Sequence, residues 1–298
     1  MLTRIEIENY RCIRKLSMTM GPLTALVGPN AAGKSTVLRA LNPAQTLLEG
    51  TFWRHDTKLS ITLRGEPTSG GTFGRGQGTG SWHPLRYQLA RLDVERLRQP
   101  NTLSPVSALD EIGSDLANAF GTLTRKQKES IAGKLKTLVP VFGDVDLIPH
   151  GGGQHIFRFQ DRWDDKLWYS PSEVSDGSML MLAYLVLQHQ DPPPQLLCIE
   201  EPDRGLHPYL LGELIALFRK MSAGELGRPV QIVLATHSAD LLNHLRPEEV
   251  RFLTRDSADG AVTVEQVDVG APDWKSTFQE YKESLGNVWL SGGVGGVP

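Results

Sequence analysis

The sequence predicts an α/β fold in which a mainly parallel central sheet is covered by helices on both faces. Short, uninterrupted apolar segments at 23–27, 196–199 and 230–235 have the composition of strands that are buried on both sides. Each is followed by residues with helical signals, which cover 33–41, 209–221 and a short stretch from Ala239. Strands that alternate with helices in this way build parallel sheets.

Composition narrows the class of protein. Of the 298 residues, 40% are hydrophobic and 22% are charged, and the formal net charge is −3, which excludes wholesale disorder. No apolar run approaches the ~20 residues that span a bilayer, and the N-terminus lacks an apolar signal-peptide region. We therefore expect a cytoplasmic protein. Cys12 and Cys198 match no metal or redox spacing and are expected to be reduced core thiols.

Local patterns place the remaining elements. Charged and apolar residues alternate over 2–8, as in a strand with one wet face. Residues 65–81 carry seven glycines and are predicted to form a mobile loop. A helix is expected from Pro105 to Phe120 with Ser104 as its cap, and a second helix after a capping box of Thr124 and Gln127.

These patterns favour one domain over 1–298. Its expected parts are an N-terminal β and glycine-turn lobe (1–64), the glycine-rich loop (65–81), a mostly helical insertion (82–150), a second lobe (151–270), and a C-terminal helix with a glycine-rich tail (271–298). By composition, the tail from Trp289 onward is expected to be disordered.

A glycine-rich turn between strand and helix forms the strongest motif. Gly28-Pro29-Asn30-Ala31-Ala32-Gly33-Lys34-Ser35 fits G-x-x-x-x-G-K-[ST], the P-loop pattern whose backbone N–H groups cradle phosphates. Lys34 is expected to reach the β- and γ-phosphates, and the Ser35 hydroxyl to bind Mg²⁺. The candidate nucleotide-binding residues here are Gly28, Asn30, Ala31, Ala32, Gly33, Lys34, Ser35 and Thr36.

Two glutamates end the apolar strand at 196–199. In a P-loop sheet, a second strand delivers one carboxylate to the Mg²⁺ shell and the next to the attacking water. Glu200 is therefore the expected metal carboxylate, usually acting through water, and Glu201 the residue that positions or deprotonates the water. Taken alone, the pair could also be solvated acids at a strand end.

Two weaker signals follow the same order along the chain. Ser175-Asp176-Gly177-Ser178 opens a helix, where a hydroxyl and a glycine can form a second anion site. Thr236-His237-Ser238 follows the strand at 230–235 and places an imidazole at the edge where open α/β sheets bind ligands. Each has an ordinary explanation, as a helix cap or a turn residue.

The ordered set of motifs resembles the ABC-type ATPases. GPNAAGKS (28–35), SDGS (175–178), CIEEPDRGLHP (198–208) and ATHSADLL (235–242) occur together, and IENYRCIRKL (7–16) precedes the P-loop. The chain is most similar to the SMC/RecF/OLD-like branch, among small bacterial stand-alone ATPases of the AAA_21 type. The resemblance implies a P-loop NTPase with an ABC-type ATPase head: a mainly parallel central sheet, an N-terminal antiparallel β-portion and a helical lid insertion.

The resemblance also implies a mechanism. Two heads associate head to tail as an ATP-dependent homodimer and enclose two ATP molecules with Mg²⁺. Ser175 and Gly177 of one copy contact the γ-phosphate held by the P-loop of the other. The catalytic residues are Lys34, Glu201 and His237, the last as a switch that senses the γ-phosphate. The segment 205–207 touches the opposite copy, and Arg11 matches a phosphate- or interface-contacting position.

Some features depart from relatives. Glu200 stands where transporter ATPases usually have aspartate, which we interpret as a mark of the branch. The glutamine that relatives place between the P-loop and the lid is not identified, and Gln77 and Gln88 are both candidates. There are no sustained heptads for coiled-coil arms, and no TOPRIM-like segment follows residue 245.

The predicted function is a Mg²⁺-dependent ATPase that drives or gates a separate effector, such as a TOPRIM-like nuclease, in DNA repair or anti-phage defence. DNA is a candidate partner: residues 86–136 hold nine Lys and Arg against six Asp and Glu, although such a run is usually a solvated face. The alternatives are the nucleotide-binding subunit of a membrane transporter and an assembly switch with negligible turnover. SDGS in place of LSGGQ argues against the transporter.

Overall fold

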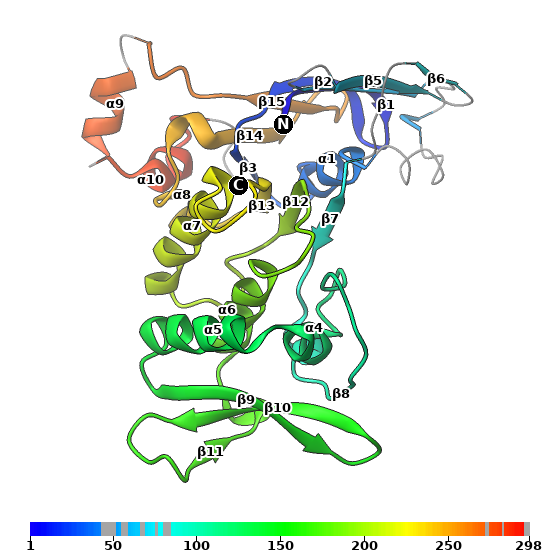
Figure 1. The fold of residues 1–298 in the computed structure, drawn as a ribbon. Helices are drawn as coiled ribbons and strands as arrows, with labels where there is room; N and C mark the ends of the chain where they lie inside the picture. The colour runs from blue at the N-terminus through cyan, green and yellow to red at the C-terminus, as the bar shows by residue number, and fades with distance from the viewer. Residues whose placement is uncertain are drawn as a thin grey trace.

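The computed structural model describes residues 1–42, 52–54, 59–65, 69–74, 77–79, 85–271, 274–281 and 283–294. Within these ranges the chain forms three sheets. Figure 1 shows a central sheet between an N-terminal sheet at one end and a smaller sheet at the other. No helix in these ranges is long and apolar enough to cross a membrane.

The central sheet has six strands in the order β15-β14-β3-β13-β12-β7. Their bounds are Val262–Glu265, Val250–Arg255, Leu23–Val27, Gln231–Thr236, Leu196–Glu200 and Tyr87–Ala90, respectively. All neighbours pair in parallel except the β14–β15 hairpin. The predicted mainly parallel sheet is confirmed, and its apolar central strands are buried on both faces.

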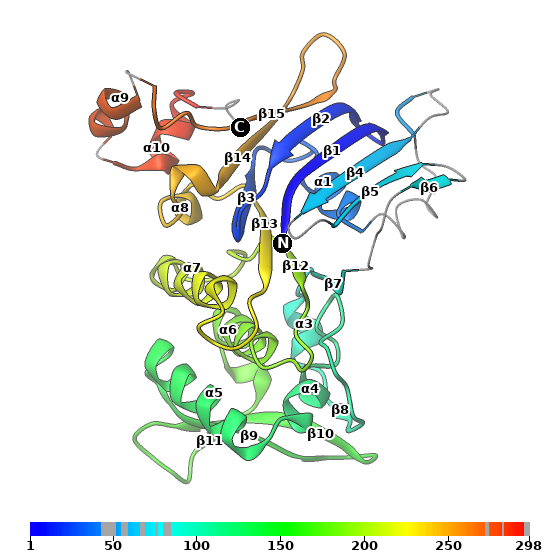
Figure 2. The same ribbon diagram turned by 45° about the horizontal axis from the view of Figure 1, so that its top comes forward.

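An antiparallel N-terminal sheet covers one face, with helix α1 (Lys34–Ala40) between the two sheets (Figure 2). Its order is β2-β1-β4-β5-β6, with bounds Ile13–Thr19, Leu2–Tyr10, Ser60–Gly65, Ser69–Gly74 and Gln77–Thr79. The loop expected at 65–81 is therefore wrong for the residues in β5 and β6. Sheet pairing uses backbone groups, so a glycine-rich segment can extend a sheet edge beside β4 without apolar side chains.

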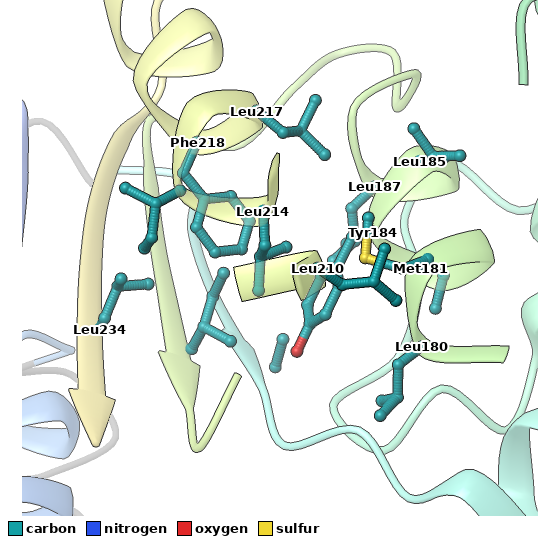
Figure 3. Close-up of a cluster of buried hydrophobic side chains, with 14 of the residues drawn as sticks. Leu180, Met181, Tyr184, Leu185, Leu187, Leu210, Leu214, Leu217, Phe218 and Leu234 are labelled. Carbon is teal, nitrogen blue, oxygen red and sulfur yellow. The ribbon is translucent and has the colours of Figure 1, made fainter. Parts of the chain in front are cut away.

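Two helices cover the other face, α6 (Asp176–Leu187) and α7 (Pro208–Ala223). Figure 3 shows their apolar side chains meeting beside β13. Tyr184 and Phe218 pack edge to face with ring centroids 5.5 Å apart, and the Tyr184 hydroxyl donates to the Pro202 carbonyl at 3.4 Å. Residues 179–187 of α6 are all buried, as expected for a helix enclosed on every side.

The described residues of 82–150, which were expected to be mostly helical, form both helices and strands. The helices are α3 (Val94–Leu97), α4 (Leu116–Thr122) and α5 (Arg125–Leu138). The third sheet joins β8 (Asn101–Thr102), β9 (Phe142–His150), β10 (Gln154–Asp161) and β11 (Trp168–Tyr169). A 3-10 turn (Pro171–Glu173) leads into α6.

The two helices predicted in this region have different outcomes. The capping box of Thr124 and Gln127 at the start of α5 is confirmed. The helix expected from Pro105 to Phe120 is wrong before residue 116. The Asp110 carboxylate accepts from the backbone N–H groups of Ile112 and Ser114, which stabilises a turn in place of helix.

The C-terminal region packs back on the chain. After α8 (Ala239–Leu242), a 3-10 turn (Pro247–Glu249) and the β14–β15 hairpin come α9 (Trp274–Glu280) and α10 (Leu285–Leu290), which contacts α8. The disorder expected from Trp289 onward is wrong at its start, because Trp289 is 1% exposed within α10. Residues 295–298 lie outside the described ranges.

Candidate functional site

The ends of three adjacent parallel strands meet at one edge of the central sheet. β3, β13 and β12 run in the same direction, so the residues that follow them lie close together. The Glu201 N–H donates to the Ala235 carbonyl at 2.8 Å, which joins two of these ends. A cavity of about 220 Å³ opens there, lined by Cys12, residues 30–36, Glu200, Glu201, Ala235 and Arg255.

Two glycines allow the tight course of the P-loop (residues 28–35). A Cβ on Gly28 would lie 2.2 Å from the Leu253 carbonyl oxygen, so no larger residue fits beside β14. Gly33 has φ +103°, a conformation that side chains rarely adopt. Ala31 also has positive φ, at 63°. The P-loop therefore turns sharply around the space that the cavity occupies.

Lys34 is buried at the base of this turn. Its Nζ donates to the carbonyls of Gly28 at 2.8 Å and Pro29 at 2.9 Å. Burial lowers the Lys34 pKa, and the negative charges of Glu201, Glu200 and Asp203 act in the opposite direction. A desolvated ammonium group beside a loop of backbone amides is suited to hold phosphate.

Glu200 is well placed as a metal carboxylate. Its side chain is 10% exposed, and one oxygen, Oε2, lies 2.7 Å from Arg91 Nε. The other oxygen, Oε1, is buried and has no hydrogen-bond partner among the described residues. With the Ser35 hydroxyl in the same cavity, the donor set is all oxygen, as Mg²⁺ prefers.

The site fits a metal ion that is bound together with a nucleotide and held partly by its phosphates. No group of three or more His, Cys, Asp or Glu suited to a metal ion occurs in the described part of the chain. Mg²⁺ typically uses one or two protein ligands with substrate phosphates and water, rather than an all-protein cage. The residues present therefore fit Mg²⁺ held by Ser35, Glu200 and phosphate.

The structure brings Glu201 and His237 together. Glu201 Oε1 lies 3.2 Å from His237 Nδ1, and both side chains are partly exposed, at 38% and 46%. Glu201 has φ 47°, so its backbone turns sharply as it leaves β12. Next to them, Thr236 Oγ1 donates to Asp203 Oδ1 at 2.7 Å and accepts from the Ser238 N–H at 3.0 Å. Glu201 lines the cavity and His237 does not, so the imidazole reaches the cavity through its contact with Glu201.

The motif at the start of α6 does not line the cavity within one chain. The exposed Ser175 caps α6 by accepting from the Ser178 N–H at 3.3 Å. Gly177 packs against the loop after β12, where a Cβ would lie 3.1 Å from the Gly205 carbonyl oxygen. Arg98 fixes the turn by donating to the carbonyls of Pro171 and Val174 and to Asp176 Oδ1, at 2.8–2.9 Å.

The remaining predicted residues are scattered around the site. Arg11 has φ 48° and its guanidinium lies 5.5 Å from the centre of the Tyr10 ring; it is not among the cavity-lining residues. Gln88 lies on β7, but its amide donates to the Leu109 carbonyl at 2.8 Å and does not line the cavity. Gln77 lies on β6, in the N-terminal sheet.

Sequence reasoning missed three residues of the site. Cys12 and Arg255 line the cavity, and the Arg255 Nε donates to the Ala31 carbonyl at 2.8 Å. Arg91 contacts Glu200. Cys12 lies within the segment IENYRCIRKL (7–16), but it was expected to be a core thiol and is instead half-buried beside the cavity. Arg91 and Arg255 belong to no motif and are brought to the site by strand pairing. An arginine directly after a short strand is too common a pattern to have marked Arg91.

Comparison with known families identifies the class of protein. A family model, AAA_21, described as "AAA domain, putative AbiEii toxin, Type IV TA system", matches residues 91–243, and one described as "AAA ATPase domain" matches residues 1–48. The first match covers more than half of the chain, which therefore belongs to this AAA_21 family. With the P-loop site, this makes the chain an ATP-hydrolysing P-loop NTPase, as its motifs predicted.

The named proteins that are similar to this chain differ in their sequence identity and in how much of each chain the match covers. The OLD nuclease of Thermus scotoductus is 47% identical over 53 residues, which are 18% of this chain and 9% of that protein. The phosphate import ATP-binding protein PstB 1 of Pseudomonas putida is 24% identical over 297 residues, 98% of this chain and 88% of that protein. The methionine import ATP-binding protein MetN of Cupriavidus metallidurans is 22% identical and covers 80% of this chain; the chain spans 56% of MetN.

Solved structures show the same fold. An Smc head bound to the C-terminal winged-helix domain of ScpA superposes with a TM-score of 0.64 at 12% identity, over 90% of this chain and 98% of that one. The SMC head domain of Thermotoga maritima gives a TM-score of 0.52 at 13% identity, over 90% and 99%. The predicted ABC-type head is confirmed as a fold.

Proposed function

We propose that this ATPase hydrolyses Mg²⁺-ATP at a composite site between two copies associated head to tail, and that the cycle gates a separate effector in DNA repair or anti-phage defence. One observation carries the proposal. Lys34, Ser35, Glu200 and Glu201 surround one cavity, whereas the exposed turn at Ser175 is absent from its lining. One chain supplies the P-loop and the two glutamates to this cavity but not the turn at 175–178, so the composite site is complete only when a second copy supplies that turn.

The residues of one copy have distinct roles in this proposal. Lys34 releases the P-loop carbonyls and donates to the β- and γ-phosphates. Glu201 accepts the proton of the attacking water, and His237, 3.2 Å from it, holds the carboxylate in place and reports on the γ-phosphate. Ser35 and Glu200 would hold Mg²⁺, which would supply positive charge against the negative charge that develops on the phosphates.

The second copy supplies the signature turn, residues 175–178. Ser175 and Asp176 are exposed there, and Arg98 fixes the turn through the Val174 carbonyl and Asp176 Oδ1. The neighbouring loop at Gly205, in contact with Gly177, belongs to the same surface and is proposed to touch the opposite copy. Arg11 is proposed to lie near this interface or the phosphates.

Three variants test these roles. Lys34→Ala is expected to abolish ATP binding. Glu201→Gln is expected to retain binding, lose turnover by 10²-fold or more, and accumulate an ATP-bound dimer. Ser175→Arg is expected to block the dimer while monomer binding persists, with Thr137→Arg on the exposed side of α5 as a matched control.

Each outcome has a direct measurement. Fluorescent-nucleotide binding, phosphate release and sedimentation velocity separate binding, turnover and dimerisation. Wild-type turnover in Glu201→Gln would reject its role as the water-positioning base. A dimer that survives Ser175→Arg would reject the composite site.

DNA as a partner is tested by the hydrolysis rate with and without double-stranded DNA across a salt series. The proposal of a DNA or nuclease connection is supported by the 53-residue match to an OLD nuclease. The exposed basic residues of α5, including Arg125 and Lys126, are the candidate contact. Stimulation that fades as salt rises indicates phosphate-backbone contact; a rate indifferent to DNA points to a protein effector.

A transporter subunit is the second candidate, because an import ATP-binding protein matches across 98% of the chain at 24% identity. The SDGS signature argues against it. An assembly switch with negligible turnover is the third candidate. The phosphate-release rate of the wild-type protein distinguishes it, since ATP binding and dimerisation with no release above the protein-free background would favour the switch.

A further inference from the structure

Arg91 stands directly behind the metal carboxylate. β7 pairs in parallel with β12, with Ala90 opposite Ile199, so residue 91 follows its strand at the level of Glu200. The Arg91 Nε lies 2.7 Å from Glu200 Oε2, the distance of a charge-assisted hydrogen bond. Arg91 is not among the residues that line the cavity, so it reaches the site only through this carboxylate.

The contact divides the two oxygens of Glu200. Oε2 is held by Arg91, whereas Oε1 is buried and has no hydrogen-bond partner among the described residues. Glu200 lines the cavity beside Ser35. Because Arg91 holds Oε2, the carboxylate keeps one orientation, in which Oε1 is available to bind a cation.

Arg91 is itself held from the opposite side. Its backbone N–H donates to the Glu111 carbonyl at 2.7 Å, and its Nη1 lies 3.9 Å from Glu111 Oε1. The Gln88 amide donates to the Leu109 carbonyl at 2.8 Å, so the segment at 109–111 fixes this end of β7. The backbone at Arg91 is thus held in place, and its guanidinium contacts two carboxylates, those of Glu200 and Glu111.

We propose that Arg91 is a positioning residue for the metal carboxylate: it fixes Glu200 through Oε2 and thereby presents Oε1 to Mg²⁺ or to a Mg²⁺-bound water. This inference rests on the role of Glu200 in the proposed function. Groups that hydrogen-bond a metal ligand orient it, and their loss typically costs 10–100-fold in metal affinity. Removing Arg91 also removes a positive charge, but that side chain is 46% exposed and Glu111 lies beside it, so the loss of orientation dominates.

The experiment measures how much Mg²⁺ strengthens the binding of a fluorescent ATP analogue, as the ratio of dissociation constants in EDTA and in Mg²⁺. In Arg91→Ala, this ratio is expected to fall about 10-fold or more, while binding in EDTA stays unchanged. Arg91→Lys keeps the charge but lacks the planar Nε donor, and is expected to restore only part of the ratio. Arg96→Ala, which removes an exposed arginine from α3 nearby, is the matched control.

Glu200→Gln separates failure of this inference from failure of the proposed function. If Glu200→Gln lowers the ratio and Arg91→Ala leaves it unchanged or raises it, the positioning role is wrong and the metal role of Glu200 stands. If Glu200→Gln itself leaves the ratio unchanged, the metal assignment fails. Full restoration by Arg91→Lys would overturn orientation as the cause. Thermal unfolding verifies that each variant is folded, and Arg91→Lys provides the test if Arg91→Ala is not.

Discussion

Replacing Gly286 by alanine tests how α10 is docked on α8. Gly286 is buried in α10, and a Cβ there would lie 2.3 Å from the Ala239 carbonyl oxygen and 2.8 Å from Asn243 Oδ1. The Gly286 N–H donates to that same Asn243 oxygen at 2.8 Å. An added methyl group therefore meets backbone, which can yield only if the helix shifts and weakens this bond.

The sign of the effect is opposite to that of helix propensity. In an open helix, glycine to alanine stabilises by about 0.8–1 kcal/mol. Overpacking costs about 1–3 kcal/mol, and weakening one hydrogen bond about 0.5–1.5 kcal/mol. We expect Gly286→Ala to lower the free energy of unfolding by about 1–3 kcal/mol in total.

The control is a glycine in an open helix. Gly133 lies within α5, and nothing lies within 4 Å of the Cβ that Gly133→Ala adds. This variant is expected to raise the free energy of unfolding by up to about 1 kcal/mol. Urea denaturation of both variants measures the change in the free energy of unfolding, which is expected to be negative for Gly286→Ala and positive for Gly133→Ala. Stabilisation of Gly286→Ala to the same extent as Gly133→Ala would refute the close packing of α10 on α8.

Three further variants test other contacts. Arg98→Ala removes bonds to two carbonyls and a carboxylate at the start of α6; we expect a loss of about 1–3 kcal/mol in urea denaturation with ATP binding to the monomer unchanged. Burial and, to a smaller extent, a nearby lysine lower the pKa of His189 in the folded protein. Between this lowered pKa and the ordinary pKa of histidine, the unfolded chain therefore binds more protons than the folded chain, and the free energy of unfolding falls as the pH drops through that range. His189→Gln is expected to reduce this fall in Tm between pH 7.5 and acidic pH, and an identical fall would contradict it. Thr236→Val loses the 2.7 Å bond to Asp203 and is expected to cost about 1 kcal/mol, measured by urea denaturation, and to slow phosphate release.

The site shows where sequence reasoning succeeds. The P-loop could be recognised because its chemistry needs glycine at fixed spacings: Gly28 lies against a carbonyl of β14, and Gly33 has positive φ. Glu200 and Glu201 could be placed because an apolar strand ends immediately before them. In each case, the feature depends on residue types that are close together in the sequence, so it can be recognised without the tertiary structure.

Local patterns failed where backbone pairing or distant packing decided the structure. The glycine-rich segment after residue 65 forms strands because β4 offers backbone groups to pair with, which composition does not reveal. Trp289 is buried although glycines follow it, because α8 provides a surface for α10. The helical spacing after Pro105 was overridden by the turn that Asp110 stabilises.

The sequence by itself determined the α/β class, the P-loop, the paired glutamates and the order of the motifs, because these depend on residue types within a few positions of one another. Only the tertiary structure decided that Arg91 holds Glu200, that Arg255 and Cys12 line the cavity, and that Glu201 lies 3.2 Å from His237. These contacts join residues brought together by the pairing of separate strands. The register of a parallel sheet is set by the whole core, so no short stretch of sequence contains it.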